Sequence, residues 1–592
     1  AFGASVNMQT EGISMQPYAE INASYGSFNA HKETVKFGTG LLKDHWAFDA
    51  RLSNIGTDGY IDRASVDLYS FYAQGGYFAD NTSVKFITFG GKEKTYHAWN
   101  YATKEEMKKY GRRFNSCGMY TDDDGHIRFY KDQTDNYLQM NYQLLLNHTF
   151  SAAWNLNAAL HYTKGDGYYQ EYKEDRSLKE YRLHPFMYDG KEVEKSDLIR
   201  QKKMDNHFGG GVFSVNYRNE KLDASLGGAL NYYDGWHFGR VIWVKNYIGE
   251  LLPDHEYYRN KAKKTDGNLY LKANYNLVAG LNAYADLQYR YINYKIHGDN
   301  DKYDYNTDGL QKLAVNDHFN FFNPKAGLNW DIDSNNRVYA SFSVAQKEPT
   351  RNNYTDGNAD EYPKAEKLYD YELGYTYRNT WLSAGVNFYY MDYKNQLVLT
   401  GELNEIGEAM ARNVPDSYRT GVELMLGVKP CRWFQWDING TLSKNRVKNF
   451  TEKLYEDEWK NPIEVEHGNT PIAFSPDFIL NNRFSFSHKG FEAALQSQYV
   501  SKQYMSNAKQ AEQTLDAYFV SNLNLAYTFQ LRHVKSVTVG FTIYNLFNEK
   551  YENNGYAGSG YTLKDGKPER YNYAGYAAQA GTNVMGNISI RF

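Results

Sequence analysis

The last nine residues of the chain read Val584-Met585-Gly586-Asn587-Ile588-Ser589-Ile590-Arg591-Phe592. Apolar side chains recur at every second position and end on the terminal Phe592, with mostly polar residues such as Asn587 and Arg591 between them. Successive side chains of a strand point to opposite faces, so this alternation predicts a β-strand with one apolar face and one polar face. Soluble sandwiches alternate as well, and strand length and connections must therefore decide the class.

The same period of two recurs along the whole chain in about 22 segments. These segments run to about 10–14 residues, which is the length that crosses a bilayer at a tilt, whereas soluble strands usually have about 5–6. The predicted strands are 17–27, 33–43, 46–56, 66–77, 83–94, 135–148, 153–163, 206–217, 221–233, 266–277, 281–295, 317–331, 337–347, 365–377, 381–396, 415–428, 433–446, 474–487, 490–503, 516–529, 536–547 and 582–592.

Short and long connections alternate between these strands. Tight turns such as 333–336 follow even-numbered strands, and most odd-numbered strands are followed by long segments, among them 95–134, 164–205, 234–265 and 548–581. Short periplasmic turns with long extracellular loops are typical of outer-membrane barrels. We therefore predict an all-β, antiparallel transmembrane barrel in the bacterial outer membrane, with its C-terminus in the periplasm. A barrel of this size is typical of transporters with a plugged lumen.

Composition supports one large barrel domain. Aromatic residues make up 17% of the 592 residues, and 56 residues are Tyr, which favours membrane interfaces. The mean hydropathy of −0.73 and the lack of long apolar runs exclude a bundle of transmembrane helices. A net charge of −4 does not indicate nucleic-acid binding. We expect the two cysteines, Cys117 and Cys431, to be unpaired structural thiols.

Four stretches carry a family resemblance, and they follow one another in the family's order. They are Leu368–Tyr375, which contains Tyr371-Glu372-Leu373-Gly374; Arg419–Leu424, which contains Gly421-Val422-Glu423; Tyr544–Glu552, which contains Asn545-Leu546-Phe547-Asn548; and the closing strand Gly581–Phe592. With them, the chain resembles the barrel of a TonB-dependent outer-membrane receptor over essentially its whole length.

The N-terminal residues resemble a different part of the same family. Gly3–Thr10 is similar to the last strand of the family's plug domain, and Tyr25–Asn29 is similar to the first barrel strand. The resemblance implies that residues 1–12 are the C-terminal remnant of a plug and that residues 13–592 are the barrel. The rest of the plug, and the segment that engages TonB, are expected upstream of this chain.

The resemblance implies active import rather than catalysis. The expected cargo is a scarce nutrient, foremost a ferric siderophore or other iron chelate, with energy delivered by TonB, ExbB and ExbD. A cobalamin importer is the alternative within this family, and a passive porin-like channel is the alternative if no plug exists. Lipid, lipopolysaccharide and a surface lipoprotein are the other expected partners. No catalytic triad, phosphate-binding loop or metal-hydrolase motif is present, so we do not predict an enzyme.

Candidate ligand residues lie in the predicted loops and combine aromatic rings with cations. Such groups can stack on and neutralise an anionic, aromatic ligand such as a ferric catecholate. Alternatively, the aromatics belong to the interfacial belt and the cations contact lipopolysaccharide. His237 can ligate haem iron or can be purely structural. The candidates are Tyr96, His97, Trp99, Tyr101, Arg112, Arg113, Trp236, His237, Arg240, Trp243, Arg351, Tyr354, Tyr556, Tyr561 and Tyr571.

Acidic stretches offer a possible structural calcium site in the loops. Asp299, Asp301 and Asp304 supply the hard oxygen ligands that calcium prefers, and Asp122–Gly125 is similar. The spacing departs from an EF-hand, however, and a solvated turn explains the same residues. No other cofactor is expected.

Overall fold

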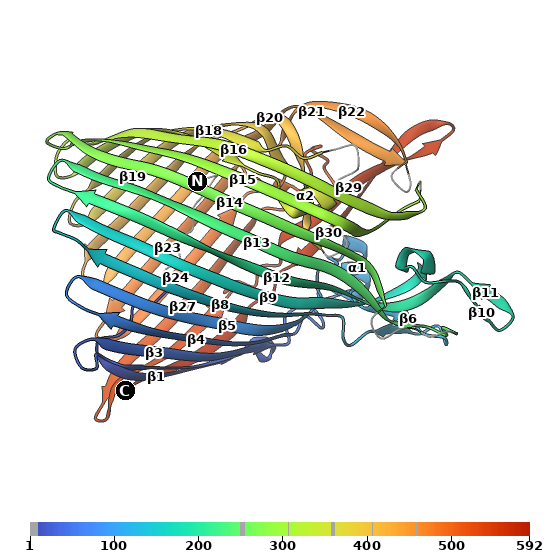
Figure 1. Cartoon of the computed structure of the whole chain (residues 1–592), viewed down its shortest axis with the longest axis horizontal. Coiled ribbons are helices and arrows are strands. Elements are labelled where there is room, and N and C mark those ends of the chain that lie inside the picture. Colours follow the sequence, from blue (N-terminus) through green and yellow to red (C-terminus); the bar gives the residue numbers. More distant parts are fainter. Residues whose placement is uncertain are drawn as a thin grey trace.

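A computed structural model describes residues 10–248, 251, 255–305, 307–356, 362–404, 407–456 and 460–592. In this part of the chain, 23 strands form one antiparallel sheet that curls into a barrel (Figure 1). The barrel closes because β31 (Asn583–Arg591) pairs with β1 (Pro17–Gly26), with Ile590 opposite Ile21. The closing strand predicted from the alternation is therefore the strand that seals the barrel.

The other strands of the barrel follow one another around the wall in chain order. They are β2 (His31–Thr39), β3 (Trp46–Thr57), β4 (Val66–Phe78), β5 (Thr82–Tyr96), β8 (Thr134–Thr149), β9 (Trp154–Ser177), β12 (Lys195–Arg218), β13 (Leu222–Val244), β14 (Glu256–Val278), β15 (Leu281–Asp304), β16 (Gly309–Asp331), β17 (Asn336–Lys347), β18 (Glu366–Arg378), β19 (Leu382–Leu403), β20 (Ala409–Cys431), β21 (Phe434–Glu456), β22 (Lys460–Pro471), β23 (Phe478–His488), β24 (Phe491–Val500), β27 (Tyr518–Leu531) and β28 (Val534–Tyr544).

The barrel has 22 strand positions, as the sequence predicts. β22 and β23 both pair with β21, but β22 pairs with residues 446–456 and β23 with residues 434–442. These two short strands therefore follow each other along one edge of β21 and fill a single position. Each predicted segment corresponds to one position, so the predicted barrel is confirmed.

Several strands are much longer than predicted. β9 and β12 have 24 residues each, so most of the predicted loop 164–205 is strand, and β13 and β14 likewise replace most of 234–265. Apolar alternation ends near Tyr162 because the next residues on its face are Lys164 and Asp166. The backbone pairing continues beyond this point, and that pairing leaves no hydropathy signal.

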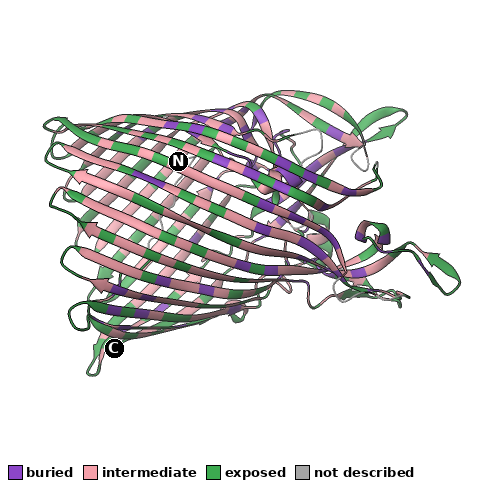
Figure 2. Cartoon of the chain, viewed as in Figure 1, coloured by how far each residue is buried: buried purple, intermediate pink, exposed green. Residues whose placement is uncertain are grey.

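The outer wall carries an apolar band on the half of the barrel nearer the short turns. On β13 and β14, for example, Leu226, Leu230, Leu269 and Leu271 are all exposed. Exposed apolar residues on one face and polar residues on the other are what a membrane-spanning barrel requires. Buried residues gather toward the opposite end, where the long loops connect the strands (Figure 2). We call these the short-turn end and the long-loop end.

Smaller elements occupy the long-loop end. α1 (Lys104–Tyr110), α2 (Arg351–Thr355) and the hairpin of β29 (Glu552–Lys564) and β30 (Lys567–Ala578) are the main ones. The others are η1 (Ser27–Asn29), η2 (Leu178–Tyr181), β6 (Met119–Thr121), β7 (Ile127–Phe129), β10 (Phe186–Tyr188), β11 (Lys191–Val193), β25 (Gln503–Tyr504) and β26 (Thr514–Leu515). Among the described residues, no helix has the length and apolar character needed to span a membrane.

The residues before β1 lie against the barrel wall. The Ser14 amide donates to Asp49 at 3.0 Å, and the Gln74 side chain donates to the Glu11 carbonyl at 3.2 Å. Residues 1–9, which include most of the predicted plug remnant, lie outside the described residues. The division into residues 1–12 and 13–592 therefore stays a prediction.

Candidate functional site

A cavity of ≈ 960 Å³ lies inside the long-loop end of the barrel. Its wall comes from the upper parts of β9, β12, β13, β14 and β15, and from α2 and the connection between β19 and β20. The lining includes Tyr169, Lys202, His237, Tyr258 and Arg351. Aromatic and cationic groups from eight separate elements therefore face one space, because Tyr137 of β8 and Tyr181 of η2 line it as well.

Ion pairs hold the cations on β12. Arg200 and Glu171 are almost completely buried and approach to 2.9 Å, and Arg200 also donates to the Tyr181 hydroxyl at 3.2 Å. Lys202 pairs with Asp301 of β15 and lies 5.7 Å from the centre of the Tyr169 ring. Burial alone raises the pKa of Glu171, but Arg200 and nearby lysines outweigh burial and lower it to about 2. The carboxylate therefore stays charged and fixes the wall.

An aromatic stack follows β5 and reaches this wall. The rings of His97 and Trp99 are stacked 3.8 Å apart, and Tyr169 lies edge-on to both at 6.0 Å. His97 is 2% exposed, and neither of its ring nitrogens has a hydrogen-bond partner in the described part of the chain. Burial lowers the pKa of His97 to about 4, so the ring is neutral at physiological pH.

The sequence predicts a loop at Trp236–Trp243, but this segment is part of β13. His237 faces the cavity, whereas Trp236 faces outward, where Lys261 and Arg259 lie over its ring at 4.6 and 5.1 Å. Arg240 lies over the Phe238 ring, two positions from Trp236, and Trp243 is 40% exposed. Only His237 of these four candidates lines the cavity.

α2 places Arg351 in the cavity and Tyr354 beneath it. Thr350 and Asn353 form a capping box at the start of this short helix. The buried Tyr354 donates its hydroxyl to Asp317 at 2.7 Å, which makes it an anchor of the helix. Arg351 donates to the Asn260 side chain at 2.9 Å.

The loop between β5 and β8 is tied to the last hairpin. Tyr101 stacks on Tyr556 at 6.4 Å, and Arg112 pairs with Glu552 at the start of β29. Tyr96 donates to two backbone carbonyls within its own loop, and Arg113 pairs with Asp62 at 3.0 Å. These four candidates hold loops together and do not line the cavity.

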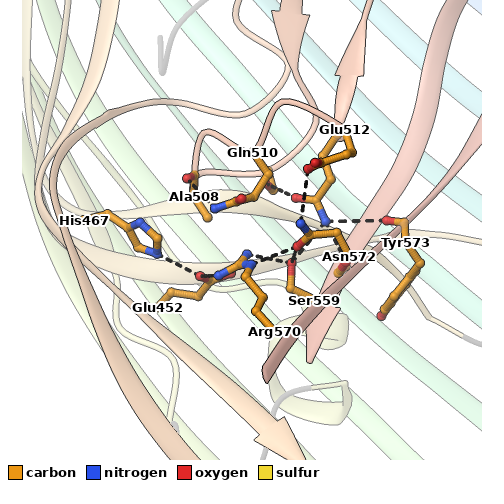
Figure 3. Close-up of polar contacts among 12 residues, drawn as sticks. Glu452, His467, Ala508, Gln510, Glu512, Ser559, Arg570, Asn572 and Tyr573 are labelled. Atoms are coloured by element: carbon orange, nitrogen blue, oxygen red, sulfur yellow. Dashed lines mark hydrogen bonds and ion pairs between the residues drawn. The ribbon is translucent and has the colours of Figure 1, made fainter. Parts of the chain in front are cut away.

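A polar network fixes the β29–β30 hairpin to β21 (Figure 3). Arg570 donates to Glu452 at 2.6 and 3.0 Å, and the His467 ring contacts the same carboxylate at 2.8 Å. Tyr561 is buried and donates to the Asn461 carbonyl, whereas Tyr571 is 40% exposed. The hairpin is therefore a packed element at the mouth of the barrel.

Comparison with known proteins identifies the family. A model of the TonB-dependent receptor-like β-barrel matches residues 76–546. The chain belongs to this family. TonB-dependent receptors are outer-membrane proteins that bind small ligands and interact with TonB, and they are transporters rather than enzymes.

Solved structures share the fold of this TonB-dependent receptor. The ferric yersiniabactin uptake receptor FyuA from Yersinia pestis is 14% identical with a TM-score of 0.68, covering 98% of this chain and 81% of that chain. The siderophore receptor PiuA from Acinetobacter baumannii is 11% identical with a TM-score of 0.70, covering 98% of this chain and 82% of that chain. The ferric citrate transporter FecA is 12% identical with a TM-score of 0.69, covering 98% of this chain and 80% of that chain. At such low identity the likeness shows the fold alone. No curated protein matches the sequence.

The predicted calcium ligands of this receptor point to separate partners. Asp299 pairs with Arg182 at 2.5 Å and with Lys312, Asp301 pairs with Lys202, and Asp304 accepts from the Thr307 hydroxyl at 3.0 Å. Among the described residues, the carboxylates and rings that converge as in a metal site are Asp122, Asp124 and His126. The calcium site stays a prediction.

Both cysteines are free, as expected.

Sequence reasoning missed the polar core of the cavity wall. Glu171, Arg200 and Lys202 lie in the stretch for which the sequence predicts the loop 164–205. A signal was present, because Tyr169-x-Glu171-x-Lys173 and Arg200-x-Lys202 keep the period of two with polar residues. Strand extensions of this kind are found by searching for polar residues at every second position directly after an apolar alternation.

Proposed function

We propose that this receptor imports a scarce iron chelate across the outer membrane. The observation that carries the proposal is the cavity itself, which is large enough for a small chelate and is walled by tyrosines and cations at the long-loop end. The long loops face the cell exterior in this proposal, and the C-terminus faces the periplasm. The neighbours named as ferric yersiniabactin, siderophore and ferric citrate receptors support iron as the cargo.

We further propose that TonB, with ExbB and ExbD, supplies the energy for import by acting on a plug domain. Lipid covers the apolar band, and lipopolysaccharide phosphates contact the outward cations directly above it. Lys261 and Arg259 over Trp236 support the latter, because cation and ring together suit a phosphorylated lipid. Native mass spectrometry of receptor from outer membranes tests this contact, and a lipid-free receptor would contradict it. A surface lipoprotein partner stays a prediction.

Growth on single iron sources tests the function. We expect a deletion strain to lose growth on at least one ferric chelate, and a strain lacking TonB to show the same loss. Normal growth of the deletion strain on every siderophore and haem source would contradict iron import. Loss of growth on limiting cobalamin alone would assign the alternative cargo, and uptake that persists without TonB would indicate a passive channel.

Replacing Trp99 by alanine is expected to weaken chelate binding by about 1–3 kcal/mol. Trp99 is partly exposed and does not itself line the cavity, but it stacks on His97 and lies edge-on to the cavity residue Tyr169, so its loss removes support for the wall. Titration calorimetry on the purified receptor measures the change. Trp243→Ala is the matched control, because Trp243 lies on the outer face. Equal effects of the two substitutions would remove Trp99 from the site.

Tyr101→Ala tests the tie between the loops. Its ring stacks on Tyr556, whereas the Trp99 ring lies against the cavity residue Tyr169, so we expect any loss of affinity to be smaller than for Trp99→Ala.

A further inference from the structure

Arg351 differs from the other two arginines of the cavity wall, Arg176 and Arg200. Arg176 pairs with Glu180 and Arg200 pairs with Glu171, but no ion pair joins Arg351 to a carboxylate among the described residues. Within the described ranges, its hydrogen-bond partner is the neutral side chain of Asn260, and its Nη1 atom is shielded from solvent without a partner. A shielded guanidinium nitrogen without an acceptor is costly, so the site is incomplete without an anion.

His237 is the second unsatisfied group on the same wall. Its Nε2 atom is also shielded and has no hydrogen-bond partner among the residues that the structure describes, and His237 and Arg351 both line the cavity. Burial, with the charge of Arg351 added, lowers the pKa of His237 to about 3. His237 is therefore neutral at physiological pH and offers a hydrogen-bonding nitrogen without a second positive charge.

The charges around the cavity limit the ligand. Six cationic and seven acidic side chains line it among the described residues, so their formal charges almost cancel. A highly negative ferric tris-catecholate finds no excess of positive charge to offset it. A chelate of low overall charge finds one uncompensated guanidinium, Arg351, which matches a single carboxylate in a forked geometry.

We propose that the cargo is an iron chelate with a free carboxylate, which Arg351 receives with His237 as the neighbouring hydrogen-bond partner. The inference rests on the proposed import of iron chelates, and it limits the cargo to chelates that carry a free carboxylate. The carboxylate belongs either to a ferric hydroxycarboxylate or to the side chain of an iron porphyrin. Because Nη1 is shielded from solvent, this contact requires the Arg351 side chain to reorient toward the cavity.

Binding measurements on the full receptor separate these ligands. The probes are ferric citrate, an iron porphyrin dicarboxylate, its dimethyl ester, a ferric tris-catecholate, and a ferric trihydroxamate without a carboxylate. We expect ferric citrate or the porphyrin dicarboxylate to bind most tightly, and which of the two binds identifies the source of the carboxylate. If the porphyrin binds, its ester binds more weakly.

Variants tie the binding to the two residues. Arg351→Gln is expected to weaken binding of the carboxylate chelate by about 10- to 100-fold, and His237→Leu by about tenfold. His237→Gln, which keeps a donor, retains most of the affinity. Arg218→Gln, an exposed cation in a pair with Asp223, is the matched control and leaves affinity unchanged. Circular dichroism of each variant checks that the barrel is folded.

Two results separate the inference from the function on which it rests. Tightest binding of the tris-catecholate or the trihydroxamate, or unchanged affinity in a folded Arg351→Gln receptor, overturns the carboxylate assignment and leaves iron import standing. If the receptor binds none of the five chelates, both the proposed function and the inference are overturned.

Discussion

Replacing Arg200 by alanine is expected to destabilise the long-loop end of the barrel by about 3–5 kcal/mol. Arg200 is 2% exposed and Glu171 is 1% exposed, so removal of the guanidinium leaves a carboxylate shielded from water. Lys173, at 3.2 Å from Glu171, compensates only in part because it is itself less buried. The tie from Arg200 to Tyr181 is lost as well.

Hydrogen exchange of the β9 and β12 amides above the apolar band measures this effect. We expect faster exchange there and little change at the short-turn end, because the ladders near the turns do not depend on the pair. Arg218→Ala is the control, since an exposed ion pair contributes less than about 1 kcal/mol. Equal protection in both variants would show that the buried pair carries no stability.

Acidity and a double variant test the same pair. Because the pKa of Glu171 in the folded protein is below the usual 4.5, the stabilisation is complete above about pH 4.5 and is lost as the pH falls toward about 2. Replacing both partners by leucine is expected to recover much of the loss, because no uncompensated charge then remains in the wall. A double variant as unstable as Arg200→Ala would indicate that shape rather than charge decides.

Hydropathy alone places every strand position of this barrel but not the ends of the strands. In β9 the outward residues up to Tyr162 contact the apolar surroundings and must be apolar, so they alternate with the lumen side. From Lys164 onward both faces of the strand are polar, and the period in hydropathy disappears while the backbone ladder with β12 continues. Strand ends above the band are therefore invisible to any method that relies on apolar residues.

The sequence predicts which types of residue form the candidate site, but it does not predict which of them face the lumen and which face outward. His237, Trp99 and Arg351 were found as aromatic or cationic loop residues, yet Trp236 and His237 are neighbours that face opposite sides of one wall. Counting in twos from the exposed Leu230 on β13 places Trp236 outward and His237 inward, once the segment is known to be strand. The pairing of Glu171 with Arg200 needs the register between β9 and β12, which the sequence does not contain.

Replacing Leu271 by arginine is expected to destabilise the barrel by about 2–4 kcal/mol. Leu271 is 49% exposed near the middle of the apolar band, opposite Leu226 on one side and Leu287 on the other. The large cost follows because a guanidinium at this depth must leave water for hydrocarbon. Adjacent Lys272 already carries a charge at the same depth, but it faces the lumen near Asp286.

The sharpest control for Leu271→Arg is Asn274→Arg, on the opposite face of the same strand. Asn274 is exposed and faces the lumen, so its arginine stays hydrated and is expected to cost less than about 1 kcal/mol. Equilibrium folding of both variants into lipid vesicles measures the difference. Equal costs would mean that the exposed leucines do not face hydrocarbon, and the band would then have to be explained by contact with another protein. A cost confined to Leu271→Arg makes lipid the solvent of the outer wall, because only the face of the strand distinguishes the two substitutions.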